Sequence, residues 1–101
     1  MQVYRVTGYV TLSRAHPSFT GARLVTAEAA GQELLGKPAA ADGDTCVVWD
    51  DLGASAGSMI AVSDGAEAAQ PFRPELKPVD AYCAAILDTI YIDPLVLKQI
   101  E

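Results

Sequence analysis

The residues best placed to carry chemistry lie in the middle of the chain, where two adjacent carboxylates precede a run of small residues. Asp50 and Asp51 are the best candidates for a pair of acid–base groups. They end a run of β-type residues, and neighbouring side chains of a strand point to opposite faces, so the two carboxylates need not share a site. Aspartate also forms turns readily, because its side chain bonds to nearby backbone amides. We therefore expect this pair to form a turn or brace a loop, rather than to catalyse a reaction.

A serine between two glycines comes next, at the spacing of a hydrolase nucleophile elbow. The string Gly53-Ala54-Ser55-Ala56-Gly57 carries it. An elbow joins a strand to a helix within a much larger α/β fold, whereas strand-type residues follow the glycines here. The string also resembles a phosphate-cradling loop, but it lacks the Walker lysine and a following helix. The small side chains instead predict a close approach of backbones, either in a tight hairpin or at a symmetry axis.

Histidine and cysteine are too sparse to predict a metal site. His16 is the only histidine, and it stands beside Pro17 in a polar loop without Cys or carboxylate at ligand spacing. Cys46 and Cys83 each lie in an apolar run, and two thiols without further ligands make a poor zinc site. We expect buried free thiols in a reducing compartment, with a disulfide as the alternative, and neither a metal nor a cofactor.

Strands are expected to position these residues, because five segments are rich in β-branched and aromatic residues. Gly8 lies inside the first segment and predicts a bulge or a sharp bend. Trp49, the only tryptophan, is expected in the core, with a subunit interface as the alternative. The expected strands are Val3 to Leu12, Leu24 to Ala29, Thr45 to Asp50, Ser58 to Ser63 and Ala84 to Ile92.

The segments between the strands are expected to be loops, apart from two short helical pieces. Ala66 to Gln70 is expected to form about one helical turn before Pro71. Leu95 to Ile100 is expected to form a short C-terminal helix, because Pro94 suits the first helical turn. Gly31 to Gly43 is rich in Gly, Ala, Pro and Asp and is expected to be a long surface loop. This pattern of short strands and turns predicts an all-β barrel or sandwich.

The length and charge of the chain limit its partners. A chain of 101 residues, 50% of them hydrophobic and 20% charged, indicates one globular domain spanning residues 1–101. The net charge of −6 repels phosphate backbones, which argues against nucleic acid as a partner. The sequence contains no apolar run long enough to span a membrane, and its first residues do not resemble a signal peptide. We expect a cytoplasmic protein without a membrane partner.

The stretch from Val47 to Gly65 resembles the core signature of the EutN/CcmL family, the vertex proteins of carboxysomes and other bacterial microcompartments. In that pattern an apolar strand and an aspartate precede a Leu-Gly-Ala-Gly-like loop, a second apolar strand and a small-residue turn. Three further stretches look like the remaining strands of the family, in the same order and without large insertions: Val6 to Val10, Gly21 to Val25, and Pro78 to Ala81 followed by Ala85 to Ile90.

The sequence departs from the family pattern at three positions. Ser55 stands where glycine is usual, Ser58 where glutamate is frequent, and Ala69 where arginine commonly follows the turn. The changes at Ser58 and Ala69 are consistent with the loss of a charge pair. They bear on the details of the interface rather than on the fold.

The resemblance implies a five-stranded OB-like β-barrel that forms a homopentamer. Such pentamers cap the vertices of an icosahedral shell whose facets consist of hexameric and trimeric shell proteins. Hexagonal sheets cannot close without five-fold defects, and a closed ring satisfies its own heterologous contacts. By the same analogy, the expected loop near the five-fold axis consists of Leu52, Gly53, Ala54, Ser55, Ala56 and Gly57. A hairpin far from the axis is the alternative.

Two other classes of function are the alternatives to a structural shell protein. An OB-like binding module for nucleic acid or a small ligand normally has a basic groove with exposed aromatic residues, whereas this chain is acidic. A small enzyme needs an acid–base or metal constellation, and no credible one occurs in the sequence. The sequence therefore favours a non-enzymatic subunit of a microcompartment shell in the bacterial cytoplasm.

Overall fold

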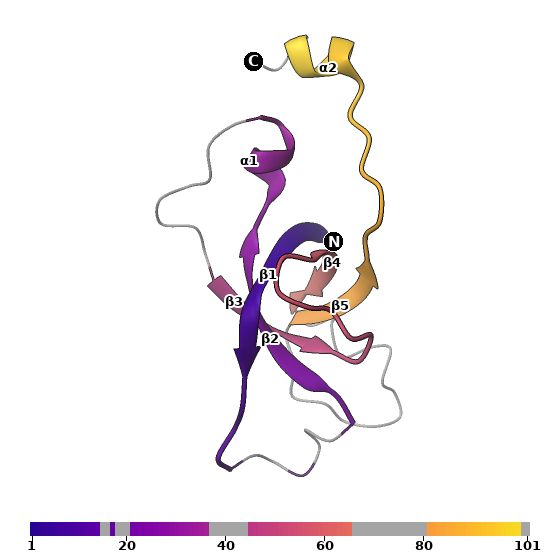
Figure 1. The fold of residues 1–101 in the computed structure, drawn as a ribbon. Coiled ribbons are helices and arrows are strands. Elements are labelled where there is room, and N and C mark those ends of the chain that lie inside the picture. The colour runs from indigo at the N-terminus through magenta and orange to yellow at the C-terminus, as the bar shows by residue number, and fades with distance from the viewer. Residues whose placement is uncertain (15–16, 18–20, 37–44, 66–80, 100–101) are drawn as a thin grey trace.

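The computed structural model, described for residues 1–14, 17, 21–36, 45–65 and 81–99, is a closed five-stranded β-barrel (Figure 1). Its strands join in the order β1-β2-β3-β5-β4, and β4 pairs with β1 to close the barrel. Every pairing is antiparallel except that of β3 with β5. The expected OB-like barrel is confirmed. Its elements are β1 (Gln2–Val10), β2 (Arg23–Ala29), α1 (Gly31–Leu34), β3 (Thr45–Asp50), β4 (Met59–Asp64), β5 (Ala81–Ile86) and α2 (Pro94–Gln99).

The core consists of small and β-branched side chains that alternate along the strands. Alternate residues point into the barrel because a strand repeats every two residues. The buried cluster is Tyr4, Val6, Val25, Ala27, Val48, Ala54, Ile60, Val62, Ala81 and Cys83. One member, Ala54, belongs to a loop and not to a strand. That loop is therefore fixed to the same core as the barrel.

Gly8 forms the bulge that the sequence predicts in the first strand. The register between β1 and β2 shifts between Val6 and Gly8. A Cβ atom at Gly8 would lie 3.3 Å from Oγ1 of Thr26, so the missing side chain permits a close approach of the two strands. The hydroxyl of Thr7 lies 2.9 Å from that of Thr26 across the same irregularity.

The last strand differs from the expectation. It runs over Ala81–Ile86, whereas the sequence favoured Ala84 to Ile92, and residues 87–93 form no strand. The reason is the length of the partner: the β4–β5 ladder ends at the pair Ile60 and Ile86, so later residues have no strand beside them. The sequence Thr-Ile-Tyr-Ile does have a high β propensity, but a segment forms a strand only when a neighbouring strand is available to pair with it.

The start of the expected long loop after the second strand is also corrected, because Gly31–Leu34 forms the short helix α1. Ala30 precedes it fully buried, and its amide donates to the carbonyl of Val3 at 3.0 Å. Arg5 of β1 pairs with Glu33 of α1. These contacts hold the helical turn against β1, so tertiary contacts outweigh a composition that is poor for helices.

Three further expectations, on the C-terminal helix, the cysteines and Trp49, agree with the structure. The C-terminal helix is present as α2, beginning at Pro94. Neither cysteine forms a disulfide; Cys83 is buried and Cys46 is half-buried. Trp49 is 3% exposed, as core packing predicts. His16, the expected helical turn at Ala66 to Gln70 and most of the Gly31 to Gly43 loop lie outside the described residues.

Within the described ranges, no helix is long and apolar enough to cross a membrane.

Candidate functional site

The loop between β3 and β4 begins at a buried carboxylate. Asp50 ends β3 and is 1% exposed. Its Oδ1 atom accepts a hydrogen bond of 2.9 Å from the amide of Leu52, and its Oδ2 atom accepts one of 2.8 Å from the amide of Ala54. Bonds from backbone amides to an ionised acceptor are among the strong ones. The expected role of this aspartate as a loop brace is confirmed, and its neighbour Asp51 is exposed.

A cation from β2 completes the brace. Arg23 lies directly opposite Asp50 in the β2–β3 register. Its Nη2 atom is 3.5 Å from Oδ2 of Asp50 and also donates to the carbonyl oxygen of Ala54. Asp50 thus holds the amide of Ala54, and Arg23 holds its carbonyl. The guanidinium of Arg23 also balances the charge of the Asp50 carboxylate, which would be costly to bury alone. Sequence reasoning missed Arg23, because its relation to Asp50 depends on the strand register.

The other end of the loop is bonded to β1. The amide of Gly57 donates to the carbonyl of Val6 at 2.8 Å, and the amide of Val6 donates to the carbonyl of Ser58 at 2.9 Å. Between these points the amide of Ser58 donates to the carbonyl of Ser55 at 2.9 Å, which closes a tight turn. The serine hydroxyls lie 3.4 Å apart. The loop is therefore attached to three strands of the barrel.

The loop presents small side chains and one leucine to solvent. Ala54 points into the core at 1% exposed, whereas Leu52 is 51% exposed. Gly53 and Gly57 have φ angles of +90° and +91°, a region that residues with a side chain adopt only under strain. The six residues singled out from the sequence form one continuous, well-braced surface loop.

The chemistry of this loop is that of a packing surface. The hydroxyl of Ser55 faces the hydroxyl of Ser58. A serine nucleophile needs a neighbouring base to take its proton, and a second hydroxyl does not serve as one. In the described part of the chain, no group of three or more His, Cys, Asp or Glu side chains is placed to hold a metal ion. Burial, followed by the charge of Asp50, raises the pKa of the Cys83 thiol to about 11, which leaves it protonated and unreactive near neutral pH.

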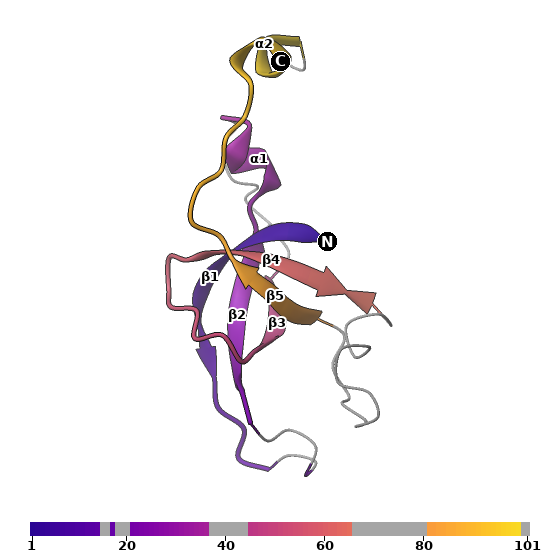
Figure 2. The same cartoon turned by 90° about the vertical axis from the view of Figure 1, so that its right-hand side faces the viewer.

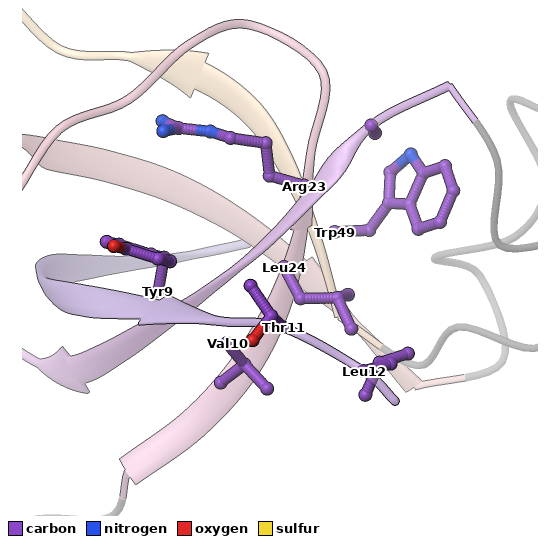
Figure 3. Close-up of a pocket in the computed structure, with 8 residues that line it drawn as sticks. Tyr9, Val10, Thr11, Leu12, Arg23, Leu24 and Trp49 are labelled. Atoms are coloured by element: carbon purple, nitrogen blue, oxygen red, sulfur yellow. The ribbon is translucent and has the colours of Figure 1, made fainter. Parts of the chain in front are cut away.

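A second surface feature lies at the loop end of the β1–β2 hairpin, and we call it the hairpin groove. It has a volume of about 470 Å³ between residues 9–12 and residues 22–24, with Trp49 beside them. Figure 3 shows Leu12, Leu24 and Trp49 gathered at one end of the groove and Tyr9 towards the other. No motif marked it in the sequence, because its walls come from separate strands.

Comparison with known proteins identifies the family of the chain. Residues 1–88 match the family model described as ethanolamine utilisation protein EutN/carboxysome. The carboxysome shell vertex protein CcmL of Gloeobacter violaceus is 36% identical over 104 residues, covering 98% of this chain and 96% of that protein. The microcompartment shell vertex protein EutN of Salmonella typhimurium is 30% identical over 90 residues, covering 89% and 86%. These relatives are structural shell proteins and not enzymes.

Solved structures agree with this assignment. The structure of Gloeobacter violaceus CcmL matches with a TM-score of 0.77 and 31% identity, covering 92% of this chain and 91% of that one. The pentameric shell protein GrpN of Rhodospirillum rubrum matches with a TM-score of 0.74 and 30% identity, covering 92% and 100%. The family model spans most of the chain, and the chain has the same barrel as these proteins. It therefore belongs to the EutN/CcmL family of microcompartment shell vertex proteins.

Proposed function

We propose that five copies of this chain form a ring that caps a vertex of an icosahedral bacterial microcompartment, in the bacterial cytoplasm. The observation that carries the proposal is the 36% identity with a shell vertex protein over 98% of the chain. The likeness to the pentameric shell protein GrpN supports the number of subunits. A hexagonal sheet closes into a shell only through five-fold defects, and a cyclic ring of this kind fills such a defect.

The partners of the ring are then the hexameric and trimeric shell proteins of the facets, which would contact its outer edge. This part of the proposal follows from shell geometry: each vertex of an icosahedron is surrounded by facets. The alternative of an OB-like binding module is not favoured, because the related proteins are shell vertex proteins.

We assign the loop from Leu52 to Gly57 to the neighbourhood of the five-fold axis. Bonds to Asp50 at one end and to Val6 at the other support this assignment, because chains that meet around an axis need a rigid backbone. The small exposed residues of the loop allow five copies to approach closely.

The mass of the purified protein in solution tests the ring. We expect light scattering on a sizing column to give five subunits of 10.6 kDa each, and particle images along the ring axis to show five-fold symmetry. A monomer across a wide range of concentration would overturn the proposal. Once the ring is found, co-expression with hexameric facet proteins tests incorporation at vertices.

Substitution of Ser55 by tryptophan tests the axis assignment separately. A bulky ring at this exposed position should prevent five loops from meeting and should disrupt assembly, while the barrel still folds. Gln32→Trp, on the exposed side of α1, is the matched control and should leave the ring intact. An unaltered ring in the Ser55→Trp variant would place the loop away from the axis without affecting the proposed vertex function.

A further inference from the structure

The chain leaves the barrel after β5 as a projecting segment, residues 87–99, which we call the C-terminal arm. The amide of Leu87 still donates to the carbonyl of Met59 at 2.8 Å. Beyond this bond the arm runs past α1 and ends in α2, which stands away from the barrel in both views (Figures 1 and 2). None of the residues of α2 is buried. The match to the family model ends at residue 88, so nearly all of the arm lies beyond it.

The arm exposes large apolar side chains. Tyr91 is 79% exposed, Leu95 71%, Val96 50% and Ile90 39%. Several large apolar side chains exposed on one short segment are typical of an interaction site. A helix of six residues is also too short to be stable by itself in water. The arm therefore requires another surface to cover it.

The backbone of the arm needs a partner as well. Residues 89–92 are Thr-Ile-Tyr-Ile, a composition typical of strands, yet the β4–β5 ladder ends at Ile86. Extended segments with unpaired backbone groups commonly add to an exposed strand edge of a neighbouring molecule. A free strand edge beside an apolar groove would satisfy both the backbone and the side chains of the arm.

The hairpin groove offers such a surface at the opposite end of the molecule. The part of β1 that pairs with β4 is Gln2–Arg5, so the edge of β1 beyond Gly8 is not covered by β4. Along that edge Tyr9 is 72% exposed and Leu12 47%. Arg23 also borders the groove and stays half-exposed although it is bound to Asp50 and Ala54, and the arm carries the carboxylates of Asp88 and Asp93.

We propose that the C-terminal arm of each subunit lies in the hairpin groove of the adjacent subunit in the ring. Figure 1 places α2 and the end of β1 at opposite ends of the molecule, so the arm projects away from its own groove. A contact between opposite ends of identical chains is head-to-tail, and it repeats from subunit to subunit until the ring closes. The proposal rests on the ring proposed above and adds the surfaces that join its subunits.

Cross-linking between the arm and the groove tests the proposal directly. The variant carries Leu95→Cys in the arm and Leu12→Cys in the groove, with Cys46→Ala to remove the half-buried thiol. We expect a flexible bismaleimide to give a ladder of covalent oligomers that ends at five subunits on a denaturing gel. A mixture of the two single variants should give only dimers. Replacing Leu12→Cys by Gln2→Cys, an exposed residue outside the groove, should give no ladder.

Shortening the arm gives an independent readout. Deletion of residues 89–101 leaves all five strands and the buried cluster in place, so the barrel should keep its circular dichroism spectrum. We expect the protein concentration at which half of the rings dissociate to rise about tenfold or more, as for the loss of an interface hot spot. Leu95→Ser should act in the same direction, and Lys98→Ser on the same helix should leave the concentration unchanged.

The outcomes separate this proposal from the ring itself. Intact rings without a ladder, or a shortened chain whose rings dissociate at the wild-type concentration, would overturn the arm contact and leave the ring standing. A cross-link within one chain would show that the arm folds onto its own barrel, which also overturns it. A wild-type protein that is monomeric by light scattering would overturn both proposals.

Discussion

The amide of Ala54 donates a hydrogen bond of 2.8 Å to the Oδ2 atom of Asp50, four residues earlier in the chain. Both residues are buried, at 1% exposed each. The bond turns the chain sharply at the end of β3 and directs the side chain of Ala54 into the core. The surface residues that follow are therefore held by the barrel itself, which is a requirement for any loop that serves as a contact surface between copies.

Replacing Asp50 by asparagine should lower the free energy of unfolding by about 2–3 kcal/mol, because two amides lose a charged acceptor and Arg23 loses its counterion. Urea denaturation at matched protein concentration measures the loss. The control is Asp51→Asn, an exposed neighbour whose change should stay within about 0.5 kcal/mol. Equal stability of the two variants would contradict the role assigned to Asp50.

Gly57 should not tolerate a side chain. Its φ angle of +91° costs an alanine about 1–2 kcal/mol, and its amide is bonded to Val6 of β1, so the strain cannot relax without breaking that bond. We expect Gly57→Ala to lower the melting temperature. Gly31→Ala, at an exposed position without positive φ or nearby atoms, should be close to neutral. A neutral Gly57→Ala variant would show that the backbone there is not fixed.

Much of the barrel could be predicted from local composition, because β3 and β4 are strongly β-type runs bounded by turn residues. The expected secondary structure was wrong where residues distant in the sequence determine the end of a strand or the formation of a helix. β5 stops at Ile86 because its partner strand ends, and α1 forms because Arg5 and Val3 of β1 hold it. No window of sequence contains that information.

The candidate site also has one part that could be predicted from local sequence and one part that could not. The brace by Asp50 was predictable, since an aspartate just before a run of small residues bonds to the amides that follow. Arg23 was not, since only the pairing of β2 with β3 places it opposite Asp50. The hairpin groove was not predictable either, because Leu24 and Trp49 approach across the same pairing.

Stability should fall in alkaline solution through Cys83. Burial and the charge of Asp50 raise the pKa of this thiol from 9.0 to about 11, so the folded state favours the protonated form. The contribution is complete below pH 9 and is lost as the pH rises to 11, because only the unfolded thiol ionises readily in that window. The loss should reach roughly 2–3 kcal/mol.

The measurement for Cys83 is the slope of unfolding free energy against pH between 9 and 11. The comparison is Cys83→Ala, which lowers stability at all pH values through its cavity but removes the thiol titration. Its slope should be shallower than that of the wild type. Identical slopes would mean that the thiol ionises equally in both states, contrary to its complete burial.

Arg23 should couple the stability of the barrel to that of the ring. Arg23→Met keeps the apolar stem of the side chain but removes the guanidinium that balances Asp50 and holds the carbonyl of Ala54. We expect a loss of about 1–2 kcal/mol in unfolding free energy, limited by the half-exposed position of Arg23. Arg23→Lys should recover only part of it, because it restores the positive charge, but its side chain is one bond shorter and both contacts of Arg23 are made by the terminal Nη2 atom.

The same pair of variants bears on the axis assignment when it is made in the chain that lacks residues 89–101, because the groove beside Arg23 then holds no arm and a loosened loop should weaken only the contacts around the axis. Rings of Arg23→Met should dissociate at a higher protein concentration than rings of Arg23→Lys, as measured by light scattering during dilution. If Arg23→Met loses barrel stability while its rings dissociate at the same concentration as those of the shortened chain with Arg23 in place, the loop from Leu52 to Gly57 takes no part in ring contacts. That result would leave the brace intact as a feature of the fold and would assign the contacts around the axis to other residues.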